Sequence, residues 1–167
     1  MKKLIFSCLS LALLMSSCDS NKEEVADETK ITKAEDRTDL ISEEENNMKE
    51  KGRNFLALKE SEEGIVKTES GLLYEILTEG EGENPVGNST VKVHYTGTFI
   101  DGKVFDSSVE RGEPIEFPLN QVIAGWTEGL QLMNKGAKYK FYIPFELAYG
   151  AQGYPGAIPP NSALIFE

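Results

Sequence analysis

Apolar and polar residues alternate along short stretches in the second half of the chain, which is the pattern of half-buried strands. Residues 91–96, VKVHYT, alternate in this way, and Lys103–Asp106 returns after Asp101-Gly102, a dipeptide typical of tight hairpin turns. The sequence therefore predicts two strands joined by a turn within Val91–Ser108. Tyr139–Ile143 alternates again and predicts a further strand.

One segment of this half has the periodicity of a helix. In Ala124–Met133 three apolar residues, Trp126, Leu130 and Met133, fall on one face. Because short strands outnumber this helix and no regular alternation of strands with helices appears, we expect an α+β fold with an antiparallel sheet. Further strands are expected at residues 72–77, 115–117 and 163–167, with loops at residues 80–89, 109–114 and 150–160.

The first 17 residues have the pattern of an export signal. Lys2-Lys3 precedes an apolar stretch, Leu4–Met15, and small residues follow before Cys18. This stretch of about a dozen residues is shorter than the roughly 20 that a membrane-spanning helix needs. Residues 1–17 resemble a bacterial lipoprotein signal peptide, which implies palmitate on Cys18, attachment to a membrane through that lipid, and an extracytoplasmic place in the cell envelope. The alternative is an ordinary secretory signal peptide.

The segment between this signal and the predicted strands is polar and charged. Residues 18–42 are acidic and poor in aromatic residues, so we expect a flexible acidic tether. A helix is expected within residues 43–63, because apolar residues recur every seven positions, at 41, 48 and 55. Two interpretations stay open: residues 43–60 mediate a dimer, or the helix packs on its own domain, which we slightly favour.

The composition of the chain limits the partners, cofactors and reaction types that we expect. Acidic residues outnumber basic ones 28 to 17, a formal net charge of −11, so we expect no nucleic-acid partner. The two cysteines, Cys8 and Cys18, lie near the N-terminus, and His94 is the single histidine. The chain after Cys18 therefore lacks thiolate ligands, and we expect neither a metal or other cofactor nor nucleophilic catalysis.

Five motifs occur in the order and near the spacing of one known family: VHYTG, DGKVFDSS, VIAGWTEGLQLM, AYG and PGAIPPNSALIF. Across about Ser70–Glu167 the chain resembles the FKBP-type peptidyl-prolyl cis-trans isomerases, and the helix followed by KTESGLLYEIL is similar to their Mip-like bacterial branch. The resemblance implies a strongly curved antiparallel β-sheet, a half-barrel wrapped around one short α-helix, within residues 64–167. In the family the last strand runs several residues past the position of Phe166, so this strand is expected to be cut short.

The resemblance also implies a site, in which Trp126 forms the floor of a pocket for a proline ring. The catalytic positions of the family correspond to Tyr95, Phe105, Asp106 and Tyr149. Taken alone, each aromatic residue fits a core position, so this prediction depends on the whole set. The substrate-binding positions correspond to Trp126, Val122, Ile123, Phe117, Phe166, Arg111, Ile115, Tyr154 and Ile158.

The implied activity is cis–trans isomerisation of X-Pro bonds, which assists the folding of exported proteins. Its partners would be proline-containing unfolded or exported polypeptides, and macrolide inhibitors would occupy the same pocket. Rotation about such a bond faces a barrier of about 18–20 kcal/mol, and an apolar pocket disfavours the charge-separated planar amide more than the twisted one. The alternative is an FKBP-like binding or scaffold module of an envelope complex, with little catalysis.

Overall fold

The computed structural model describes residues 28–167, with side chains from Leu40 onward. The chain divides into two compact units, and the second, Thr38–Glu167, contains every described strand. The described part of the first unit, residues 28–37, is helical. The predicted signal peptide and Cys18 lie outside the described residues. Among residues 28–167, no helix combines the length and the apolar character needed to cross a membrane.

Helix α1 (Glu28–Glu60) corrects the predicted tether. Residues 28–42 are helical, whereas the acidic composition predicted a flexible segment. That stretch contains neither glycine nor proline, the two residues that most disfavour a helix interior, so its charge is compatible with a solvated helix. The helix ends at Glu60, and Ser61–Gly64 forms the turn that leads into the first strand.

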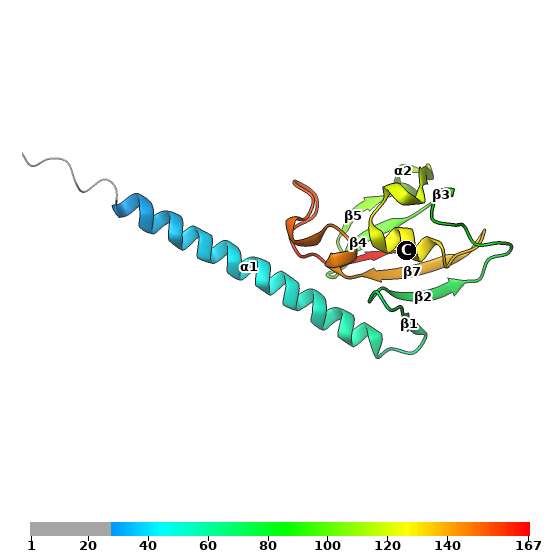
Figure 1. Cartoon of the computed structure of the whole chain (residues 1–167), viewed down its shortest axis with the longest axis horizontal. Helices are drawn as coiled ribbons and strands as arrows, with labels where there is room; N and C mark the ends of the chain where they lie inside the picture. The colour runs from blue at the N-terminus through cyan, green and yellow to red at the C-terminus, as the bar shows by residue number, and fades with distance from the viewer. Residues whose placement is uncertain (1–27) are drawn as a thin grey trace, which may run out of the picture. The chain divides into compact units, whose positions relative to one another are not determined.

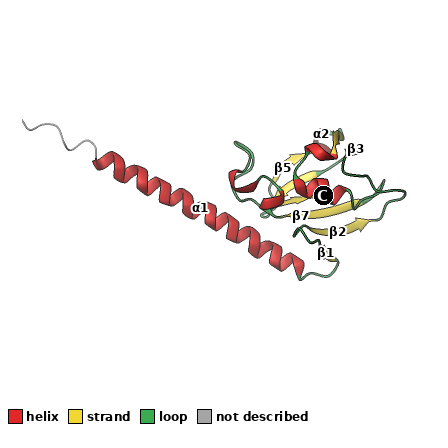
Figure 2. Cartoon of the chain, in the orientation of Figure 1, coloured by secondary structure: helices red, strands yellow, loops and turns green. Residues whose placement is uncertain are grey.

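The strands form two antiparallel sheets (Figures 1 and 2). In the larger one, six strands follow the order β1-β2-β7-β8-β4-β5, and β3 pairs with β6 in the smaller one. The strands are β1 (Ile65–Lys67), β2 (Leu73–Thr78), β3 (Thr90–Val93), β4 (Thr96–Phe99), β5 (Val104–Ser107), β6 (Ile115–Pro118), β7 (Lys138–Ile143) and β8 (Leu164–Phe166). The helical segments after α1 are α2 (Ser108–Arg111), α3 (Ala124–Leu130) and the 3₁₀ turns η1 (Leu119–Gln121), η2 (Phe145–Leu147) and η3 (Gly150–Gln152).

The first strand of the predicted hairpin is divided in two. β3 ends at Val93 and β4 begins at Thr96, and these two strands belong to different sheets. At the break the Tyr95 N–H donates to the Ser108 hydroxyl over 2.8 Å, and the Ser108 N–H donates to the Tyr95 carbonyl over 3.0 Å. Ser108 therefore satisfies backbone groups that have left the ladder. The turn after β4 lies at Asp101-Gly102 as predicted.

Helix α3 (yellow in Figure 1) packs against β7 through two glycines. A Cβ atom at Gly125 would lie 2.6 Å from the Ile143 side chain, and one at Gly129 would lie 2.6 Å from the Phe141 ring. The backbones of helix and sheet can approach this closely only because each of these two glycines has a hydrogen atom in place of a side chain. The predicted α+β fold, an antiparallel sheet packed on one short helix, is confirmed.

Candidate functional site: an aromatic pocket

Four aromatic rings from four other parts of the chain cluster around Trp126, in the first turn of α3. Its ring lies 5.0 Å from that of Tyr95 at 81° and 5.0 Å from that of Phe166 at 79°, both edge-on. Phe117 on β6 lies 5.3 Å away at 39°. Phe105 on β5 extends the cluster through Phe166, 5.5 Å away at 86°. The structure thus brings together the predicted floor and its predicted aromatic walls.

Gly97 on β4 makes room for two of these walls. A Cβ atom at this position would lie 2.6 Å from Cζ of Phe105 and 2.9 Å from Cε1 of Phe166, closer than real Cβ contacts. The sequence prediction did not assign Gly97 to the site. A signal was present, because glycine inside a strand often marks a close approach to its backbone. Phe99, whose ring lies 5.0 Å from Phe105, was also missed.

The remaining predicted substrate contacts divide into core and rim. Val122, Ile123 and Ile115 are partly buried against the core, and Ile158 is buried within it. Tyr149 and Tyr154 are more exposed, at 37% and 58%, and their rings lie 5.8 Å apart. The two tyrosines therefore form an accessible aromatic pair, while the aliphatic residues pack on the core.

The indole N–H of Trp126 is buried and has no hydrogen-bond partner within the described part of the chain. A buried donor without a partner costs about 1–3 kcal/mol. Its surroundings are the edge-on rings of Tyr95 and Phe166. Within the described residues, Trp126 is therefore held in the cluster by ring packing and not by a hydrogen bond of its indole.

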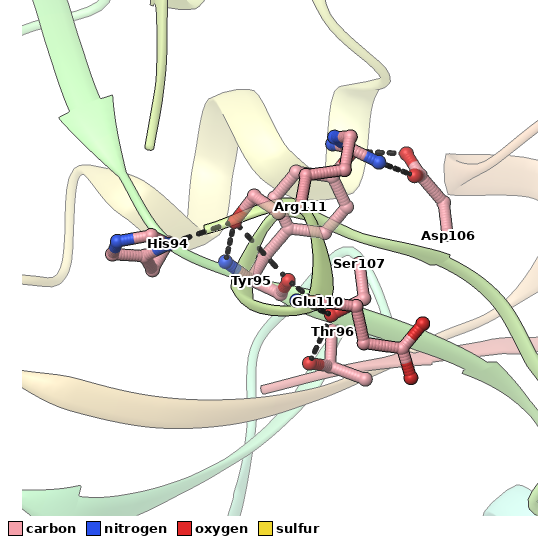
Figure 3. Close-up of polar contacts among 8 residues, drawn as sticks. His94, Tyr95, Thr96, Asp106, Ser107, Glu110 and Arg111 are labelled. Carbon is pink, nitrogen blue, oxygen red and sulfur yellow. Dashed lines mark hydrogen bonds and ion pairs between the residues drawn. The ribbon is translucent and has the colours of Figure 1, made fainter. Parts of the chain in front are cut away.

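A polar network borders the aromatic cluster (Figure 3). The Tyr95 hydroxyl donates to the Asp106 carboxylate, and the Arg111 guanidinium forms an ion pair with the same carboxylate. Arg111 also donates to the Tyr95 hydroxyl over 3.2 Å, and its Cζ lies 5.8 Å from the centre of the Tyr95 ring. The three side chains hold one another in place.

The helix that carries Arg111 corrects a predicted loop, because residues 108–111 form α2. Ser107 caps its N-terminus by accepting the Glu110 N–H over 3.2 Å, and Gly112 ends it in a left-handed conformation. Ser107 and Glu110 have the spacing of a capping box, a sequence signal that could have revealed the helix. This turn brings Arg111 back towards Asp106.

The network shifts the pKa values of its members. Burial alone would raise the pKa of Asp106, but hydrogen bonds from Tyr95 and Arg111 outweigh it and hold that pKa below its usual value. Burial and the hydrogen bond to Asp106 raise the pKa of Tyr95. Burial, with the nearby charge of Asp106, also raises the pKa of Tyr149. At neutral pH Asp106 is therefore a carboxylate and both tyrosines keep their protons.

Ile123 immediately precedes α3, and the hydrogen bonds of its backbone are relevant to the candidate site. Its carbonyl accepts the N–H groups of Trp126 and Thr127 over 2.9 and 3.0 Å. Within the part of the chain that the structure describes, its own N–H has no backbone acceptor.

His94 lies at the same break in the strands, but its side chain is exposed. Its Nδ1 is 3.2 Å from the Ser108 hydroxyl. His94 thus contacts the residue that satisfies the strand break, and the polar network of Tyr95, Asp106 and Arg111 does not include it.

Comparison with known proteins places this pocket in a family. Residues 81–167 match the FKBP-type peptidyl-prolyl cis-trans isomerases, and residues 12–76 match the domain amino-terminal to them. The chain is 50% identical over 137 residues to the FKBP-type isomerase FkpA of Aeromonas hydrophila, covering 82% of this chain and 49% of that protein. It is 48% identical to the isomerase Mip of Coxiella burnetii, covering 71% of this chain and 51% of that protein. It thus spans about half the length of these curated relatives.

Solved structures agree. The crystal structure of FkpA from Escherichia coli has a TM-score of 0.75 and 42% identity, covering 87% of this chain and 71% of that one. A peptidyl-prolyl cis-trans isomerase from Pseudomonas syringae has a TM-score of 0.68 and 39% identity, covering 72% and 89%. Sequence, fold and pocket lead to one assignment: this chain belongs to the FKBP-type peptidyl-prolyl cis-trans isomerase family.

Proposed function

We propose that this chain catalyses cis–trans isomerisation of X-Pro bonds in polypeptides, through the pocket around Trp126. The observation that carries the proposal is the aromatic cluster, in which the rings of Tyr95, Phe117 and Phe166 lie 5.0–5.3 Å from the indole. The described residues contain no group of three His, Cys, Asp or Glu side chains that could hold a metal ion. The mechanism is accordingly built from the pocket residues themselves.

The pocket acts by preferring the twisted amide over the planar one. A planar X-Pro amide is charge-separated, with partial negative charge on its oxygen, and rotation removes that resonance. Transfer into the apolar surface formed by Trp126, Phe105 and Phe166 destabilises the planar form more, which lowers the barrier. A millionfold acceleration would require about 8 kcal/mol of preferential stabilisation.

The polar groups fix the peptide and the walls. The Ile123 N–H and the Tyr149 hydroxyl are donors for carbonyls on either side of the rotating bond, so the remainder of the chain stays still while the prolyl bond turns. Asp106, held by Arg111, accepts from Tyr95 and fixes that ring against Trp126. We assign to Asp106 a role in keeping the wall rigid.

The test is the cis-to-trans rate of a short X-Pro-Phe peptide with the full chain, beside Phe105→Ala and Asp106→Ala. Clear acceleration that falls at least about tenfold in both folded variants, a change of about 1.4 kcal/mol in the barrier, supports the proposal. The exposed loop substitution Val86→Ala is the control and should match the wild type. A folded wild type without acceleration would leave the binding or scaffold module as the better account.

The same proposal covers ligands and substrates. Macrolide inhibitors would occupy the pocket, with Tyr154 at the rim and Ile115 against the core setting their affinity. Proline-containing exported polypeptides are the proposed substrates, because the N-terminal pattern is that of an exported protein. Competition between a macrolide and a proline peptide, followed through the fluorescence of Trp126, the single tryptophan, tests the shared site.

We further propose that lipid on Cys18 holds the chain at a membrane of the bacterial envelope, on its extracytoplasmic side. The support is the basic, apolar and small-residue pattern of residues 1–17 before this cysteine. Labelled palmitate should be incorporated into the wild-type protein and not into the Cys18→Ser variant. Equal labelling of both would refute lipid attachment at this residue.

Of the two interpretations of residues 43–60, we propose that this helix packs on its own domain. The Phe55 ring lies 6.1 Å from that of Tyr142 on β7, and Lys59 Nζ lies 5.5 Å from the centre of the same ring. Phe55 is one of the positions of the seven-residue repeat, and this contact packs it against β7 of its own domain. Sedimentation of Phe55→Glu tests this: an unchanged monomer supports packing, whereas a wild-type dimer that dissociates in the variant supports dimerisation.

A further inference from the structure

The second half of α1 contacts the segment that carries the pocket rim. A Cβ atom at Gly52 would lie 3.1 Å from Cβ of Ala163, so helix and segment touch almost backbone to backbone. Seven residues earlier, the carbonyl of Glu45 accepts a hydrogen bond from the Asn161 side-chain amide over 3.4 Å. Both contacts lie at the end of the segment that leads into β8.

The same helix also contacts the beginning of that segment. Arg53 Nη2 lies 3.7 Å from Glu146 Oε1, and Lys49 Nζ lies 5.5 Å from the centre of the Phe145 ring. Residues 145–163 are therefore held by α1 at both ends. Between these ends lie three predicted site residues, Tyr149, Tyr154 and Ile158.

Hydrogen bonds within the segment make it move as one piece. Tyr154 and Ile158 exchange two backbone hydrogen bonds of 2.8 Å, and the Asn161 N–H closes the base on the Gly150 carbonyl over 3.1 Å. Asn161 is buried and has a φ of 56°, a left-handed conformation that is uncommon for residues other than glycine. A shift of Asn161 or Ala163 would therefore move Tyr149 and Ile158 as well.

Docking of α1 depends on few contacts. The Arg53–Glu146 pair is largely exposed and contributes at most about 1 kcal/mol. Beside the helix, an open groove of about 500 Å³ is lined in part by Leu56, Ala57 and Leu73, so this side of α1 is not sealed. The close approach at Gly52, the ring contact at Phe55 and the Asn161 amide bond to Glu45 can each be removed by one substitution.

From this geometry we infer that α1 is a positioning element of the pocket. By docking through Gly52 it sets the position of the 145–163 segment, and with it the substrate contacts of Tyr149 and Ile158. This inference rests on the proposed isomerase function. It predicts that undocking α1 weakens substrate binding, while the floor and walls around Trp126, which α1 does not contact in any described interaction, stay in place.

The test is Gly52→Leu in the full chain. Leucine favours a helix by about 1 kcal/mol over glycine, so α1 itself is strengthened, but the new side chain cannot fit against Ala163. We expect KM for an X-Pro peptide to rise about fivefold, equivalent to about 1 kcal/mol, with kcat nearly unchanged. Lys51→Leu, at the exposed neighbouring position, is the matched control and should behave as the wild type.

Three further variants keep the outcome clear. Gly52→Ala should raise KM less, and adding Ala163→Gly should restore it, because the added and removed methyl groups occupy the same contact. If Gly52→Leu does not fold, Asn161→Gly replaces it, since glycine keeps the positive φ and loses only the amide that binds α1. This variant should raise KM as well.

A binding measurement separates failure of this inference from failure of the proposed function. The Kd of a proline peptide is measured through Trp126 fluorescence, which does not require turnover. A fivefold weaker Kd in Gly52→Leu supports positioning even if the wild type proves to be a poor catalyst. Folded, helical Gly52→Leu or Asn161→Gly with the KM and Kd of Lys51→Leu would overturn the inference.

Discussion

Gly97→Ala tests the packing of the pocket walls more sharply than removal of an aromatic ring would. The new Cβ atom would lie 2.6 and 2.8 Å from two atoms of the Phe105 ring and 2.9 Å from the Phe166 ring. All three distances are shorter than real Cβ contacts, so at least one ring must move. One methyl group therefore perturbs two walls without deleting any functional side chain.

The magnitude follows from overpacking. Inserting a methyl group into a well-packed core typically costs about 1–3 kcal/mol, because side chains leave their rotamers or the backbone shifts. We expect the free energy of unfolding in urea to fall by about this amount. The isomerase rate should fall with it, since Phe105 and Phe166 both face the proposed proline ring.

The first control adds the same methyl group at a glycine outside the aromatic cluster. A Cβ atom at Gly87 would meet only Gln131, at 3.6 Å, an ordinary contact, so Gly87→Ala should leave stability and rate unchanged. Adding Phe105→Leu to Gly97→Ala should recover part of the stability by making space, without recovering the rate. A folded Gly97→Ala with wild-type stability and rate would refute the packing described here.

Three other predictions follow from the polar network. Because the pKa of Asp106 is depressed in the fold, its ionised form stabilises the protein above the ordinary value of 3.8, and this contribution is lost as pH falls through the folded pKa. Urea midpoints should therefore decline below about pH 4 more steeply for the wild type than for Asp106→Asn, and parallel declines would contradict this. Arg111→Lys should raise the pKa of Asp106 in an NMR titration, because an ammonium cannot reproduce the planar guanidinium that reaches both Asp106 and Tyr95; an unchanged pKa would show that Arg111 is not its partner. Ser107→Ala should lower the free energy of unfolding by about 1 kcal/mol through loss of the α2 cap, whereas no change would mean that the cap contributes nothing.

The resemblance to the family implied the pocket residues, because those positions carry side chains whose identity the chemistry of the site restricts. Trp126, Phe105 and Phe166 come from separate elements, and the structure brings them together around one floor. Local pattern was sufficient for most strands as well. It failed at His94-Tyr95, where apolar and polar residues keep alternating although the backbone leaves one sheet for another.

Long-range contacts explain the other differences. The acidity of residues 28–42 indicated a tether, but nothing in that stretch breaks a helix, and α1 begins at Glu28. By propensity alone, a glycine at position 52 disfavours a helix. In the structure its missing side chain is what allows α1 to approach Ala163, a partner more than a hundred residues away in the sequence.

The central claim, catalysis by the aromatic pocket, is tested most directly by exchange NMR on an X-Pro-Phe peptide at equilibrium. Uncatalysed exchange takes about 10–100 s at 25 °C. The account predicts that the full chain, at low concentration relative to the peptide, accelerates cis–trans exchange without altering the cis fraction, and that Phe105→Ala loses most of this effect. A folded wild type that binds the peptide and shifts its cis fraction when in excess, yet leaves the exchange rate unchanged, would contradict the account and identify a binding module.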